Sequence, residues 1–111
     1  MKLRETLTTA AAILILAWPI TQGLAAEADA GKTIYEKNCA GCHGADGNGN
    51  PAVAKTLGEK GLNIVGKETM QKSDGVLLTI IVEGAGKMPA NKKLNKIEQK
   101  QVLSYTRTLA K

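Results

Sequence analysis

The most apolar stretch in the C-terminal half of the chain, residues 76–82, predicts a buried helix. Ser73 precedes it and is a good N-cap, and Gly84 follows it and can end a helix. The β-branched residues of the stretch would also suit a strand, but a strand with no second run to pair with is unstable. We therefore expect a helix between Ser73 and Gly84.

The end of the chain predicts a longer amphipathic helix. Asn95 and Glu98 resemble a capping box, and the helix should continue to about Ala110. Its apolar positions recur at helical spacing: Val102, Tyr105 and Leu109. Shorter helices are expected near residues 30–38, 52–57 and 67–71, and a glycine-rich loop over residues 44–51. The pattern as a whole predicts one all-α, loop-rich domain.

The first quarter of the chain has the pattern of a removable export signal. It has a basic start, an apolar run over residues 10–20 and an end rich in small residues. The run is shorter than the roughly 20 apolar residues that span a bilayer, so an uncleaved anchor is the weaker interpretation and we expect no stable membrane insertion. We assign residues 1–28 to a signal peptide, cleaved somewhere after 25 to 28, and residues 29–111 to a periplasmic domain.

Composition shows that this domain has too few large apolar side chains for an ordinary core. After cleavage it would keep two aromatic residues, Tyr35 and Tyr105, and no Trp or Phe. Domains of this size often depend on a disulfide, a metal or a cofactor for stability. The sequence therefore suggests that a large apolar group completes the core.

The charge balance favours an acidic partner. The whole chain has 15 basic and 10 acidic residues, and residues 29–111 keep 13 and 8 of them. Such an excess suits nucleic acid, an anionic membrane surface or an acidic protein. Because an exported protein is unlikely to meet nucleic acid and the lysines are scattered, we expect an acidic protein partner.

Residues 39–43 read Cys-Ala-Gly-Cys-His, the spacing that attaches c-type haem. On a helical turn, residues three apart share a face, so the thiols of Cys39 and Cys42 can both bond the vinyl groups along one side of a porphyrin. His43 can then ligate the iron. We therefore expect one covalent haem c.

Other chemistries for two cysteines explain less of the sequence. A disulfide here would close a loop of two intervening residues and remove little chain entropy. A thioredoxin-type pair calls for a strand-helix-strand setting, which the pattern does not predict. A structural zinc site needs four ligands, and two cysteines with the single histidine supply three.

A second iron ligand must come from elsewhere in the chain, and because His43 is the only histidine, the candidates are Met70 and Met88. Met88 follows two glycines that free the backbone and precedes Pro89, which favours an extended conformation, so its side chain should project from a loop. Met70 lies in an expected helical turn, where methionine usually fills core. We expect Met88 to be the axial ligand, with Met70 or an open position as the alternatives.

The chain resembles the class I cytochromes c, in particular the small periplasmic monohaem type of bacteria. The resemblance extends from Asp29 to Leu109 and rests on three features: Cys39-Ala40-Gly41-Cys42-His43-Gly44, Gly84-x-Gly86-x-Met88-Pro89, and the final helix with Leu94, Val102, Tyr105 and Leu109. It implies the small cytochrome c fold, in which the first and last helices cross and short helices and loops surround one haem.

The resemblance also implies roles for single residues. Gly31 should allow the crossing helices to approach closely, with Tyr35 and Tyr105 near the contact. The family has a proline whose carbonyl accepts a hydrogen bond from the proximal histidine, and Pro51 is the matching candidate for His43. We expect the following residues to form the walls of the haem crevice: Val53, Leu57, Leu62, Ile64, Val65, Leu77, Ile81 and Leu94.

A haem ligated on both sides has no vacant position for oxygen or peroxide, so we expect an electron carrier and not an enzyme. Lys87, Lys92 and Lys93 surround Met88 in the sequence and are candidates for docking an acidic redox partner, or alternatively are simply solvating charges. Two other functions stay open: an enzyme or gas sensor in which Met88 does not hold the iron, and a permanent subunit of a larger oxidoreductase.

Overall fold

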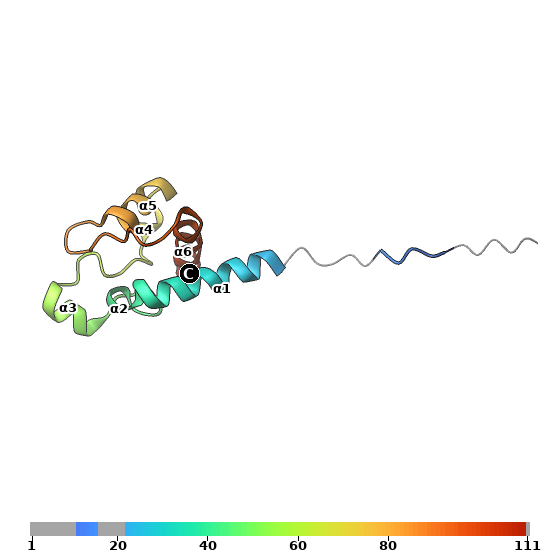
Figure 1. Cartoon of the computed structure of the whole chain (residues 1–111). Helices are drawn as coiled ribbons and strands as arrows, with labels where there is room; N and C mark the ends of the chain where they lie inside the picture. Colours follow the sequence, from blue (N-terminus) through green and yellow to red (C-terminus); the bar gives the residue numbers. More distant parts are fainter. Residues whose placement is uncertain (1–10, 16–21, 111) are drawn as a thin grey trace, which may run out of the picture.

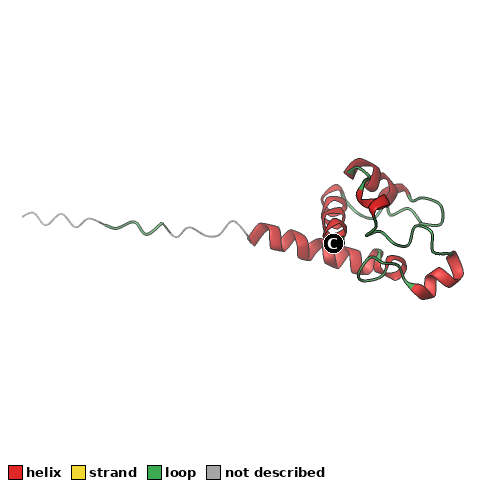
Figure 2. Cartoon of the chain, turned by 180° about the vertical axis from the view of Figure 1, so that it is seen from behind, coloured by secondary structure: helices red, strands yellow, loops and turns green. Residues whose placement is uncertain are grey.

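A computed structural model describes residues 11–15 and 22–110, and within these ranges it contains six helices and no strand (Figures 1 and 2). The helices are α1 (Gln22–Asn38), α2 (Ala40–His43), α3 (Pro51–Leu57), α4 (Lys67–Met70), α5 (Asp74–Glu83) and α6 (Lys96–Leu109). The all-α prediction is therefore confirmed. None of the described helices combines the length and the apolar character that a membrane crossing needs.

Helix α1 is longer than predicted, because it begins at Gln22 and not near residue 30. The added turns contain Ala25, Ala26 and Ala28, and alanine has the highest helix propensity of all residues. Most of the signal peptide predicted over residues 1–28 lies outside the described residues, so its cleavage stays a prediction.

Helices α1 and α6 cross and form the main helix contact of the fold (Figure 1). At the crossing, Gly31 is buried against α6, where a Cβ would lie 2.9 Å from the Cβ of Tyr105 and would collide with the carbonyl oxygen of Gln101. Beside it, Tyr35 is fully buried, and its ring centroid lies 5.4 Å from that of Tyr105. The predicted crossing and the predicted role of Gly31 are confirmed.

The two C-terminal helices begin and end as their capping residues predict. The Ser73 side chain accepts a hydrogen bond from the Val76 N–H at the start of α5, and Gly84 caps its end with φ +78°. At the start of α6, Asn95 and Glu98 form both hydrogen bonds of a capping box, each 2.9 Å long. These caps satisfy backbone groups that a helix end would otherwise leave unpaired.

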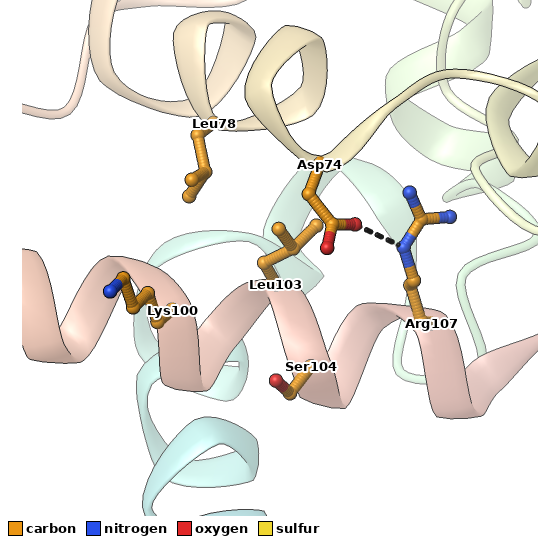
Figure 3. Close-up of a pocket in the computed structure, with 6 residues that line it drawn as sticks. All are labelled: Asp74, Leu78, Lys100, Leu103, Ser104 and Arg107. Atoms are coloured by element: carbon orange, nitrogen blue, oxygen red, sulfur yellow. Dashed lines mark hydrogen bonds and ion pairs between the residues drawn. The ribbon is translucent and has the colours of Figure 1, made fainter.

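Arg107 ties α6 to the segment around α5. Its Nε donates to Oδ1 of Asp74 at 2.7 Å, and Nη2 donates to the carbonyl of Lys72 at 2.8 Å. Figure 3 shows this ion pair beside Leu103 of α6, which faces Leu78 of α5. The link holds α5 against the crossed pair of helices.

The buried apolar core is small. Its members are Tyr35, Leu62, Leu77, Val102 and Leu103. Of the predicted crevice residues, Leu62 and Leu77 are buried, Leu57 is 38% exposed, and the rest are half-buried: Val53, Ile64, Val65, Ile81 and Leu94. The fold therefore presents apolar side chains that protein atoms cover only partly.

Candidate functional site

The Cys-Ala-Gly-Cys-His segment forms its own short helical turn directly after α1. The Cys39 N–H donates to the carbonyl of Tyr35 at 2.8 Å, and the His43 N–H donates to the carbonyl of Cys39 at 3.0 Å. Cys42 and His43 lie on this turn, and Cys39 is its N-cap residue, three positions before Cys42. Both thiols are free, with Cys39 half-buried, Cys42 exposed and His43 buried.

The environment of the cysteines disfavours the alternative chemistries. Burial, and after it the neighbouring Cys42, raises the pKa of the Cys39 thiol, whereas reactive cysteines in redox pairs have a lowered pKa. No cluster of three or more His, Cys, Asp or Glu side chains that could hold a metal ion occurs within the described residues. Two thiols three residues apart, followed directly by a histidine, are instead the groups that attach a c-type haem and ligate its iron.

A backbone carbonyl fixes the ring of His43. Its Nδ1 lies 2.8 Å from the carbonyl oxygen of Leu62, so Nδ1–H donates and the lone pair of Nε2 is left for a metal. The prediction that Pro51 supplies this carbonyl is wrong. Pro51 is instead the first residue of α3, directly after the N-cap Asn50.

The loop after the motif explains why Leu62 takes this position. The chain folds back on itself at residues 47–49, where the Ile64 N–H donates to the Gly47 carbonyl at 2.8 Å. Gly49, with φ +98°, packs closely against the segment around Leu62. A Cβ on Gly49 would lie 3.1 Å from the Cβ of Leu62. The carbonyl that reaches His43 therefore lies 19 residues away in the sequence, brought there by long-range packing.

Tyr35 supports the same segment from the side of α1. Its hydroxyl donates to the carbonyl of Gly44, the residue after His43, at 2.6 Å. Burial is the largest cause that raises the pKa of Tyr35 well above its ordinary value, and the proximity of Cys39 adds to it. The sequence motif does not include Tyr35, and only its place next to the helix crossing hinted at this contact.

Met88 lies at the end of a tight turn, as predicted. The N–H groups of Ala85 and Met88 each donate to the other residue's carbonyl, at 3.1 and 2.9 Å. Gly86, the second residue of the turn, has φ +55°, and Lys87, the third, has a negative φ, because only glycines among the described residues have a positive φ. This combination defines a type II′ turn. The side chain of Met88 is half-buried.

The turn is anchored to α5 on both sides. A Cβ on Gly84 would lie 2.9 Å from the nitrogen of Ala90 and 3.0 Å from the carbonyl carbon of Pro89, so the loop packs directly on this glycine. The Asn91 N–H donates to two carbonyls near the end of α5, at 3.2 and 3.1 Å. The loop after α5, orange in Figure 1, therefore has a defined path on the side of the molecule across from α2 and α3.

Met70 lies in α4, also as predicted, and is half-buried. All three lysines near Met88 are exposed, and the Nζ of Lys87 also donates to the carbonyl of Leu57 at 2.9 Å. The methionine that ligates and the lysines that dock a partner stay predictions at this point.

The residues of this site suit a covalent haem. Two free thiols lie three residues apart on a helical turn, the neighbouring histidine has one ring nitrogen bound to a carbonyl and the other available, and partly covered apolar side chains can pack on a flat apolar ring. Proximal histidines and thioether bonds are what attach haem in c-type cytochromes.

Comparison with known proteins agrees with this chemistry. Residues 26–105 match the family described as cytochrome c oxidase, cbb3-type, subunit III. The chain is 37% identical over 87 residues to the cbb3-type cytochrome c oxidase subunit CcoP of Azospirillum brasilense, which covers 77% of this chain and 29% of that protein. It is 39% identical over 67 residues to cytochrome c6 of Leptolyngbya boryana, 60% of this chain and 73% of that protein.

The chain thus spans less than a third of its oxidase-subunit relative but most of cytochrome c6. The family match includes the cysteine–histidine turn, both crossing helices up to Tyr105 and the loop with Met88. From the free thiols, the oriented histidine and these similarities it follows that the chain belongs to the class I cytochrome c family and functions in electron transfer with a covalently bound c-type haem.

Proposed function

We propose that this chain is an exported one-electron carrier whose haem is attached through Cys39 and Cys42 and ligated by His43 and Met88. The bound haem supplies a one-electron iron couple. The hydrogen bond from His43 to Leu62 holds the imidazole ring in one tautomer and one orientation. Thioether ligation by Met88, together with apolar surroundings, favours the reduced state.

The observation that carries the Met88 assignment is the type II′ turn, anchored to α5, that presents this residue. A ligand held on a fixed loop loses little freedom when it binds. Met70 provides a matched control, because it is the other methionine among the described residues and is equally half-buried.

The test compares Met88→Ala with Met70→Ala in haem-loaded protein. We expect Met88→Ala to abolish the charge-transfer absorption of a thioether-ligated ferric haem and to let the reduced protein bind carbon monoxide. Met70→Ala should keep the absorption and exclude carbon monoxide. The reverse pattern would assign the ligand to Met70, and a wild-type protein that already binds carbon monoxide readily would favour an enzyme or gas sensor.

We further propose that Lys92 and Lys93 attract an acidic redox partner, because both are exposed and follow the Met88 loop. Electron-transfer encounters are small, weak and salt-dependent. Oxidation by the anion ferricyanide should slow as ionic strength rises, and either Lys92→Glu or Lys93→Glu should weaken that dependence more than Lys32→Glu, which places the same change on α1. A rate indifferent to ionic strength in the wild type would refute the docking surface.

A second candidate function is favoured by the similarity to the oxidase subunit CcoP. In that case the chain would deliver electrons as a fixed part of a larger oxidoreductase. Size-exclusion chromatography of the protein extracted mildly from its native cells separates the two, since a carrier elutes as a monomer and a subunit elutes with the complex.

Export is tested by the intact mass. Protein purified from a host that attaches c-type haem should have the mass of the chain without its first 25 to 28 residues plus one haem. A mass that includes residues 1–28 would refute cleavage.

A further inference from the structure

Lys87 connects the loop that presents Met88 to helix α3. Its Nζ donates to the main-chain carbonyl of Leu57 at 2.9 Å, 30 residues away in the sequence. Among the described residues, this is the only hydrogen bond by which a side chain of the loop 84–91 reaches α3, and no ion pair engages Lys87 there. The contact therefore bridges two segments that the backbone bonds of the loop do not join.

The carbonyl of Leu57 is a suitable acceptor for an ammonium group. Leu57 is the last residue of α3, and the N–H of the following Gly58 is used by the carbonyl of Ala54. The last carbonyls of a helix have no intrahelical partner, and the negative end of the helix dipole attracts cations. Lys87 thus satisfies a backbone acceptor that would otherwise depend on water.

The bridge joins the segments that orient the two proposed iron ligands. On one side, α3 ends at Leu57, and five residues further along the chain lies Leu62, whose carbonyl binds His43. On the other side, Lys87 directly precedes Met88 in the type II′ turn. In Figure 1 the orange loop after α5 lies above the green helix α3 at the same end of the molecule, and the hydrogen bond of Lys87 links these two segments directly.

We propose that Lys87 is a positioning residue, which straps the Met88 loop to the end of α3 and so keeps the sulfur of Met88 in place as a ligand. The inference rests on the proposed ligation by His43 and Met88. It also assigns different roles to the three lysines near Met88. Lys87 is engaged by the carbonyl at the end of α3, and Lys92 and Lys93 are left for a partner.

The experiment measures how fast imidazole binds to the ferric, haem-loaded protein, because imidazole must displace the Met88 sulfur. Lys87→Leu removes the donor and should accelerate binding about fivefold, which corresponds to about 1 kcal/mol for one exposed hydrogen bond from a charged group. Lys87→Arg keeps a cationic donor and should return the rate to near that of the wild type.

Lys92→Leu is the matched control. It removes the same charge from the same loop region, but its side chain forms no hydrogen bond or ion pair among the described residues. Its imidazole rate should stay within about twofold of the wild type, since it loses charge alone. A general electrostatic effect would instead move both leucine variants equally.

The outcomes separate the strap from the ligation. Equal rates for Lys87→Leu and Lys92→Leu, beside a slow wild type, overturn the strap alone. A wild-type protein that binds imidazole as fast as Met88→Ala overturns the ligation and the strap together. A faster rate in Lys87→Leu, restored in Lys87→Arg, supports both.

Discussion

The crossing of α1 and α6 allows a sharp test of the fold, because the close approach of the two helices depends on the absence of a Cβ at Gly31. In Gly31→Ala the new Cβ would lie 2.9 Å from the carbonyl carbon of Gln101 and equally close to the Cβ of Tyr105. Carbon atoms in contact prefer separations of about 3.5 to 4.0 Å. Because the carbonyl belongs to the 14-residue helix α6, relief requires moving that helix and not a side-chain end.

The magnitude follows from two opposing terms. Extra atoms in a packed interface cost about 1 to 3 kcal/mol, and contact with backbone places this case at the upper end. Alanine stabilises a helix by about 1 kcal/mol relative to glycine. We therefore expect Gly31→Ala to lower the free energy of unfolding by about 2 kcal/mol, or the melting temperature by roughly 10 °C.

Gly75→Ala is the matched control, since Gly75 also lies in a helix but a Cβ there would meet no atom within 4 Å. It should raise stability by about 0.5 kcal/mol through helix propensity alone. Guanidinium unfolding of both haem-loaded variants, followed by far-ultraviolet circular dichroism, measures the difference. If Gly31→Ala is as stable as Gly75→Ala, the backbones of α1 and α6 do not approach each other so closely at Gly31.

Three further predictions concern other contacts. Because the pKa of Tyr35 is raised in the fold, the stability that its neutral form contributes is present below the unfolded pKa of about 10 and is lost as the pH rises beyond it. In unfolding curves measured at alkaline pH, Tyr35→Phe should therefore lose less stability with rising pH than the wild type. At neutral pH the same substitution should cost about 1 kcal/mol, because the hydrogen bond to Gly44 is lost. Gly84→Ala should destabilise more than Gly58→Ala in thermal melts, since both glycines have positive φ but only Gly84 packs on other backbone, and equal losses would contradict that packing. Arg107→Gln should lower stability by about 1 kcal/mol, because a half-buried guanidinium binds both Asp74 and a backbone carbonyl; added salt should not reproduce the loss, as it would for a purely electrostatic surface pair.

Much of the helical framework was predictable from local sequence. Ser73, Gly84, Asn95 and Glu98 all take the capping positions expected of them. Such caps depend on hydrogen bonds between residues three or four positions apart, which a short window of sequence already contains. The start of α1 was missed because its first turns fall in the predicted signal segment.

The site was predictable where its residues are adjacent in the sequence, and it was not predictable where the loops bring distant residues together. Cys39, Cys42 and His43 share one helical turn, so their spacing alone indicates haem attachment. The hydrogen-bond partner of His43 was predicted as Pro51 and is Leu62. Every residue has a backbone carbonyl, so residue type does not indicate which carbonyl will lie beside the His43 ring.

By itself, the sequence determined the helical turn that carries two thiols and an imidazole, the capped helices and the glycine turn before Met88. The tertiary structure decided which carbonyl orients His43, that Tyr35 supports the turn through Gly44, and that Lys87 bonds to the end of α3. The reason is one of range. Local hydrogen bonds are set by residue type and spacing, whereas contacts between residues 9 to 30 positions apart depend on how glycine-rich loops fold back on the crossed helices.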